Sequence, residues 1–241
     1  MDTNASSHTL TARTHFASGK LSISFGETVL DAGCGLGHVA AHFTDCVGKD
    51  GCVVGIDSSE AMVAEAKKNY QFGNLKFRVE NIYQIKNARN CYDAAYVGRV
   101  LHHLKRPENA LKEVVRVLKP KGRIAVTEPD FCSSFIYPCD CGGSCELINC
   151  FSSSVSYGCM GRRLRQLFYD SGLVNICIKA STHTFESISA VNNIIPFDGY
   201  LNSLQENSDN KKFIMDIKEA DRRGSFLFGW SLFTAYGVKP G

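Results

Sequence analysis

The sequence lacks the features that mark membrane-spanning, secreted and nucleic-acid-binding proteins. It contains no run of about 20 apolar residues, the length that a membrane-spanning helix needs. Its first residues are polar and lack the apolar stretch of a secretory signal. The formal net charge is +3, but no tract rich in Lys and Arg concentrates it, so a nucleic-acid partner is not expected. We therefore expect a cytoplasmic protein without a membrane contact.

Cysteine, by contrast, is plentiful. The chain has 11 cysteines, an odd number that excludes a complete set of internal disulfides. A cluster of them falls within a short stretch: Cys132, Cys139, Cys141, Cys145, Cys150 and Cys159. Their spacing lacks the closely paired cysteines of a typical zinc site. In the absence of an export signal, we expect reduced thiols and no bound metal.

The pattern of apolar residues predicts one α/β domain. The chain has 241 residues, of which 44% are hydrophobic and 21% charged, so a full core can form. Short apolar runs alternate with longer amphipathic runs, as in a parallel sheet with helical crossovers. We expect strands at 28–32, 52–56, 75–80, 92–97, 123–127, 174–179 and 226–236, with helices at 36–47, 60–70, 107–119 and 161–171. These elements predict a doubly wound, mostly parallel, seven-stranded sheet.

Three segments fall outside this alternation. Residues 1–25 are polar and read as an N-terminal tail, which leaves residues 26–241 as the domain. Residues 129–160 are irregular and rich in Cys, Ser and Gly, whereas residues 184–222 are polar and helical in pattern. We expect these two inserts to form a cap, or lid, over the substrate. Aromatic candidates for lining the cavity beneath it are Tyr137, Phe151, Tyr157, Phe197 and Trp230. Each can equally be core, and for Trp230 on the last strand a core position is favoured.

A glycine-rich loop, residues 31–37, lies directly after the first strand and opens the next helix. Glycines at 33, 35 and 37 permit positive φ and a close approach of ligand to backbone. Asp57 ends the second strand, where a carboxylate can accept hydrogen bonds from ribose hydroxyls. The spacing differs from the G-x-G-x-x-G of dinucleotide sites. Asp31 would also repel a pyrophosphate but suits a cation such as the sulfonium and ammonium groups of S-adenosylmethionine (SAM).

The segment 28–35 resembles the first motif of class I SAM-dependent methyltransferases, in the form common in the ubiquinone/menaquinone and small-molecule group. Further segments are similar to other motifs and regions of that family: 55–59, 92–93, 101–104, 118–123, 161–173 and 224–228. The resemblance implies a Rossmann-like fold and methyl transfer from SAM to a small-molecule acceptor at O, N, C or S. Methylation of a macromolecule and a non-catalytic SAM-binding domain remain alternatives, and neither the acceptor nor the oligomeric state is indicated.

The resemblance also implies roles for individual residues. Asp31 and Gly33 would border the methionine part of SAM, Gly35 would support the turn, and Asp57 would hold the ribose. The remaining residues expected at the cofactor are Ser58, Met62, Asn81, Ile82 and Gly98. Ser58 and Met62 would flank the adenine, although Met62 can equally be a core residue. Glu80-Asn81 stands where the family has Gly-Asp, so Asn81 would meet the adenine amine through its amide oxygen and Glu80 would face solvent.

Methyl transfer needs alignment of nucleophile, methyl group and sulfur. A general base is required only when the nucleophile must lose a proton. Candidates are His102, His103, Glu128, Asp130 and His183. We expect one of the two carboxylates to face the substrate cavity. A packed structural histidine and an ion-paired acid remain the alternatives.

Overall fold

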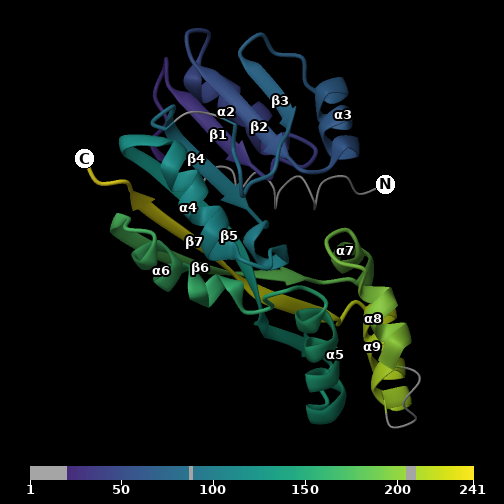
Figure 1. Ribbon diagram of the computed structural model, residues 1–241. Helices are drawn as coiled ribbons and strands as arrows, with labels where there is room; N and C mark the ends of the chain where they lie inside the picture. The colour runs from purple at the N-terminus through teal and green to yellow at the C-terminus, as the bar shows by residue number, and fades with distance from the viewer. Residues whose placement is uncertain (1–20, 87–88, 205–209) are drawn as a thin grey trace.

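A seven-stranded mixed sheet forms the centre of the protein (Figure 1). The computed structural model describes residues 21–86, 89–204 and 210–241. The strands are β1 (Thr28–Ala32), β2 (Cys52–Asp57), β3 (Leu75–Val79), β4 (Tyr92–Gly98), β5 (Leu118–Tyr137), β6 (Val174–Phe185) and β7 (Leu227–Val238). Their order is β3-β2-β1-β4-β5-β7-β6, with β7 antiparallel to both neighbours. The predicted α/β class with a mostly parallel, seven-stranded sheet is confirmed.

Helices cover both faces of the sheet. On one side are α2 (His38–Val47) and α3 (Glu60–Asn69), and on the other α4 (Pro107–Val117) and α6 (Met160–Asp170) (Figure 1). The central strands β1 and β2 are buried along almost their whole length, as expected for strands covered on both faces. Pro107 stands at the first turn of α4, where its missing N–H costs nothing. Among the described residues, no helix is long and apolar enough to cross a membrane.

The start of the chain differs in part from the predicted tail. Residues 1–20 lie outside the described residues. Leu21, however, is fully buried, and its carbonyl accepts a hydrogen bond from Nε of Arg123 at 2.6 Å. Arg123 also pairs with Glu27. The packed part of the domain therefore begins before residue 26.

The insert 129–160 is more regular than predicted. Strand β5 continues through Pro129 to Tyr137, with a shift in its register against β7 between Asp130 and Phe135. Helix α5 (Cys141–Ser153) follows, and Oδ1 of Asp140 caps it by accepting the N–H of Gly143 at 2.9 Å. The many Gly, Ser and Cys residues hide the helical period of this segment, so only the capping Asp signals it.

A second group of helices forms a lobe beyond the end of the sheet (Figure 1). It consists of α5, α7 (Ile188–Asn192), α8 (Phe197–Leu204) and α9 (Lys211–Arg223). These helices share an aromatic core with the ends of β5 and β7, in which Phe151, Phe197, Phe228 and Trp230 are at most 2% exposed. The lobe therefore has apolar contacts of its own and is continuous with the sheet.

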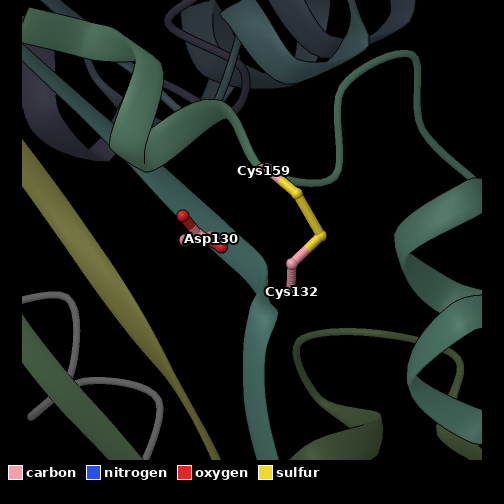
Figure 2. Close-up of side chains that lie close together, drawn as sticks. All are labelled: Asp130, Cys132 and Cys159. Carbon is pink, nitrogen blue, oxygen red and sulfur yellow. A yellow bond between two sulfur atoms is a disulfide. The ribbon is translucent and has the colours of Figure 1, made fainter. Parts of the chain in front are cut away.

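A disulfide joins Cys132, just past the buried part of β5, to Cys159 at the start of α6 (Figure 2). The prediction of reduced thiols is wrong for this pair, because the two Cα atoms lie 5.5 Å apart despite a separation of 27 residues. The other nine cysteines, all within the described residues, form no disulfide. Asp130 lies close to the two sulfurs, but Arg162 occupies both of its carboxylate oxygens. The expectation of no metal stays a prediction.

Removing the disulfide should destabilise the protein. In the absence of reductant, we expect Cys132→Ser combined with Cys159→Ser to lower the free energy of unfolding by about 2–4 kcal/mol, because the unfolded chain regains the entropy of an open loop. Denaturant unfolding with and without reductant measures this, and reductant should abolish the difference. Cys139→Ser with Cys150→Ser, which replaces two exposed free cysteines, is the matched control. Equal stability of the two double variants without reductant would contradict the disulfide.

Candidate functional site

A cavity of about 1090 Å³ opens at the carboxyl ends of the parallel strands. Residues that follow β1, β2, β3, β4 and β5 all contribute to its lining. This is the edge at which open α/β sheets bind their ligands. Its size matches the upper end of ordinary ligand pockets, roughly 300–1,000 Å³, so it can hold a cofactor and a small molecule together.

The glycine loop forms one wall of this cavity. The N–H groups of Gly33 and Cys34 donate to the carbonyl of Ile56 at 2.7 and 2.9 Å, which ties the loop to β2. Gly33 has φ of 83°, and a Cβ there would lie 2.2 Å from a methyl carbon of Val100. At Gly35, φ is 51°, and a Cβ added there would meet no atom within 4 Å beyond its chain neighbours. The loop therefore packs tightly against Val100 at Gly33 and leaves open backbone at Gly35, where it lines the cavity.

Asp31 is buried in the cavity wall with one oxygen unused. Asp31 is 2% exposed, and its Oδ2 atom has no hydrogen-bond partner. Burial raises the pKa of this carboxyl from 3.8 to about 7, a hydrogen bond from the backbone of Ala40 partly offsets this, and the charge of Asp57 adds to it. An unpaired buried carboxyl is costly. A cationic group bound in the cavity would pair with it and restore its ionised form.

Asp57 connects the glycine loop to the start of α3. Its Oδ2 accepts the N–H of Gly35 and its Oδ1 accepts the N–H of Ser59, both at 2.9 Å. Each oxygen keeps a second lone pair that a hydroxyl can use. Ser59, not Ser58, caps α3, through the N–H of Met62 at 3.3 Å. Ser58 and Met62 line the cavity, and Met62 is 44% exposed, so it is not a core residue.

The segment after β3 departs from one expectation. Asn81 and Ile82 line the cavity, as does Gly98 after β4. The amide oxygen of Asn81 already accepts the N–H of Tyr83 at 3.0 Å, so any adenine contact would share this oxygen. Glu80 was expected to face solvent, and this is wrong. Its side chain is 3% exposed and pairs with Arg78 at 3.7 Å.

The turn after β4 is organised around Glu128. This side chain is fully buried and accepts the N–H groups of Val100 and Leu101 at 2.8 and 2.7 Å. Its Oε2 lies 2.5 Å from Nδ1 of His102. Because a carboxylate oxygen accepts here, we assign the imidazole proton to Nδ1, which leaves Nε2 of His102 as an acceptor. His102 lines the cavity and is 4% exposed.

The other candidate bases lie in different surroundings. His103 lines the cavity with its ring centroid 3.9 Å from that of His102. Neither Glu128 nor Asp130 lines it, so the expectation that one of these carboxylates faces the cavity does not hold. Glu128 is linked to the cavity only through His102. Asp130 forms a bidentate ion pair with Arg162. His183 lies on β6 and is likewise not part of the lining.

The far wall of the cavity is apolar and comes from both inserts and from β7. Phe151 and Trp230 line it as proposed, whereas Tyr137, Tyr157 and Phe197 do not. Sequence reasoning missed several lining residues: Tyr96, Phe131, Val155, Ile194, Ile195, Tyr200 and Leu232. They lie on six separate elements or loops, and no local spacing marks them. Edge-to-face contacts of Phe131 with both Phe151 and Trp230 connect the wall to the lobe core.

Comparisons with known proteins agree with this architecture. A family model described as a methyltransferase domain matches residues 23–172. An uncharacterized 37.1 kDa protein in transposon TN4556 of Streptomyces fradiae is 31% identical over 177 residues, which make up 70% of this chain and 50% of that protein. A demethylmenaquinone methyltransferase of Oceanobacillus iheyensis is 30% identical over 112 residues, 45% of this chain and 47% of that one. The chain thus spans about half the length of these curated relatives.

A solved structure extends the similarity to the whole fold. The YcgJ protein from Bacillus subtilis superposes with a TM-score of 0.68, over 97% of this chain and 99% of that one. The sequence identity is 18%. At this identity the similarity shows a shared fold and assigns no role to the site.

Asp31 should make stability depend on pH. Its pKa is raised to about 7 in the folded protein, so the stabilisation present below about pH 4 is lost as pH rises to 7. We expect Asp31→Asn, which does not titrate, to gain stability relative to the wild type over this range, on the order of 4 kcal/mol in total. Denaturant unfolding at several pH values measures the difference. A gap between the two proteins that stays constant from pH 4 to 8 would contradict the assignment.

The tautomer of His102 tests the hydrogen bond between its Nδ1 atom and Glu128. At pH 8, we expect ¹⁵N-resolved NMR to show the proton of His102 on Nδ1, because Glu128 accepts it. Glu128→Gln should yield a mixture of tautomers, since an amide can donate as well as accept. His103→Gln identifies the neighbouring signal and should leave the tautomer of His102 unchanged. Observation of the Nε2–H form in the wild type would refute the proposed geometry.

Proposed function

The chain belongs to the methyltransferase domain family, and on this premise we propose that it transfers a methyl group from SAM to a small-molecule acceptor. The observation that carries the proposal is the orphaned, buried oxygen of Asp31, which lies in the same cavity wall as the carboxylate of Asp57. A ligand with a cationic end and a ribose satisfies both groups. SAM has both features.

The residues present fit SAM along its length. Asp31 would receive the ammonium group of the methionine part, and the open backbone at Gly35 leaves room for this part to lie across the loop. Asp57 would accept hydrogen bonds from the ribose hydroxyls. Ser58, Met62, Asn81 and Ile82 would surround the adenine, and Gly98 would border the cofactor after β4. A nicotinamide dinucleotide fits poorly, because its pyrophosphate would meet two carboxylates.

The main contribution of the protein to methyl transfer would be to align the acceptor with the methyl group and the sulfur of SAM. When bound, SAM supplies a methyl group on a sulfonium, which is already a good leaving group, so orientation of the acceptor can account for much of the acceleration. His102 would take a proton from an acceptor hydroxyl, amine or carbon acid through Nε2. Glu128 would hold the ring in the tautomer needed for this step and stabilise the imidazolium that forms. An acceptor that is already ionised would not need His102.

A small acceptor is favoured over a macromolecule. The apolar wall is built from the two inserts and backs onto the buried lobe core, so it suits a molecule that enters a cavity better than one that lies on a flat face. Phe131, Phe151 and Trp230 together offer a large aromatic surface with little exposure to solvent. We therefore place both inserts, 129–160 and 184–222, in the role of a substrate cap.

Calorimetric titration with SAM tests the proposal. We expect the wild type to bind, and Asp57→Ala to weaken binding by roughly 10- to 100-fold, as loss of one or two hydrogen bonds to a charged group implies. Asp50→Ala, which removes an exposed carboxylate that does not line the cavity, should change nothing. No binding by the wild type at millimolar SAM would refute the proposal. Release of S-adenosylhomocysteine in the presence of a panel of small acceptors then separates an enzyme from a domain that only binds SAM.

A further inference from the structure

The residues that line the cavity are sorted by charge along the edge of the sheet. Carboxylates follow the first three strands in spatial order: Glu80 after β3, Asp57 on β2 and Asp31 on β1. The next strand is β4, and it is followed by Arg99. Among the described residues that line the cavity, Arg99 is the sole Arg or Lys. The edge is thus acidic over β3, β2 and β1 and becomes basic at β4.

Arg99 is held in an unusual backbone conformation. Its φ is 58°, in the left-handed region, which costs a residue other than glycine roughly 1–3 kcal/mol. The backbone N–H of Arg99 donates to the carbonyl of Thr127 on β5 at 2.8 Å, which holds the bend against the sheet. The neighbouring contacts of Glu128 fix the residues that follow. The fold therefore maintains a strained turn that presents this side chain at the cavity.

The guanidinium of Arg99 is available to a ligand. The side chain is exposed, and it forms no ion pair with any carboxylate in the part of the chain that the structure describes. Partial burial, the neighbouring His102 and the charge of Arg99 lower the pKa of His103, and the charge of Glu128 offsets this only in part. His103 is therefore uncharged near neutral pH. Arg99 is the fixed cation of this part of the cavity.

The wall beyond Arg99 is apolar. It continues the edge over β5 and β7, where Phe131 and Trp230 lie, and it includes Phe151 and Val155 from the first insert. The carboxylates among the described lining residues all belong to the β1–β3 side. A molecule in this half of the cavity would meet one cation on the β4 side and aromatic surface along its body.

We infer that the acceptor is an amphipathic small molecule with an apolar ring system or chain and one anionic group, a carboxylate or a phosphate, and that Arg99 selects it by binding that group. A guanidinium recognises both anions through paired N–H donors. The inference rests on the proposed function, because it assigns the acceptor to the part of the cavity that SAM does not fill.

Three probes with the same apolar body test the inference: 2-naphthoate, 2-naphthyl phosphate and the neutral 2-naphthamide. Binding is measured by calorimetry or ligand-observed NMR on protein saturated with S-adenosylhomocysteine, in about 50 mM salt, where surface charges are weakly screened. We expect at least one anionic probe to bind the wild type about tenfold more tightly than the amide. The better anion distinguishes a carboxylate acceptor from a phosphorylated one.

Variants then assign the preference to Arg99. Arg99→Asn keeps a residue that tolerates positive φ and should reduce the preference to less than twofold. Arg99→Lys should still bind the anionic probe at least threefold more tightly than the amide. Arg165→Gln removes an exposed charge on α6 that does not line the cavity and should leave it unchanged. Val155→Ser should weaken all three probes equally, which places their apolar body against the wall.

Two outcomes would overturn the inference alone. The first is binding of S-adenosylhomocysteine by the wild type without any preference for an anionic probe. The second is a preference that survives in Arg99→Asn while binding of S-adenosylhomocysteine weakens, since Arg99 would then serve the carboxylate of the cofactor. Failure of the wild type to bind S-adenosylhomocysteine at all would instead refute the proposed function, and this inference with it.

Discussion

The buried side chain of Glu128 holds together the part of the molecule on which the cavity depends. It extends from β5 to the turn after β4 and accepts backbone N–H groups of that turn as well as the ring of His102. A buried carboxylate without donors would cost several kcal/mol, so the turn cannot move away without a large penalty. The cap is positioned against the same turn, because the N–H of Tyr157 donates to the carbonyl of His102 at 3.0 Å. One side chain thereby sets the geometry of the sheet edge, the histidine and the cap.

Strand order arranges the chemistry of the cavity. Each parallel strand ends at the same edge, so the residue after each strand takes a place that follows the spatial order of the sheet. Asp57 and Asp31 lie side by side because β2 pairs with β1, and Arg99 comes next because β1 pairs with β4. β1 and β4 pair in the sheet although β2 and β3 lie between them in the chain, so residues that are distant in sequence become neighbours at this point. The carboxylates lie on the β1 side of this point and Arg99 lies on the β4 side. On this separation of charge we base the proposal of a cationic donor and an anionic acceptor in one cavity.

The cap is an extension of the sheet as much as an addition to it. β5 and β7 continue past the parallel core and supply Phe131 and Trp230, which join the aromatic core of the lobe. The disulfide between Cys132 and Cys159 fastens this extension to α6 on the face of the sheet. The apolar wall therefore rests on three fixed supports: the paired strands, the lobe core and the covalent link. These supports hold the apolar wall in place next to the strained turn at Arg99.

Local sequence determined the elements of the central sheet and the donor half of the cavity. The apolar periods predicted the strands and helices, and the glycine loop with Asp31 and Asp57 could be placed because residues that end parallel strands must meet at one edge. Contacts between distant segments were decided by the tertiary structure alone. The pairs Glu128–His102, Asp130–Arg162 and Cys132–Cys159 depend on distances between elements, which residue types and local spacing do not encode. For that reason the sequence indicated a methyl donor, whereas only the folded chain showed the apolar wall against which we propose that the acceptor binds.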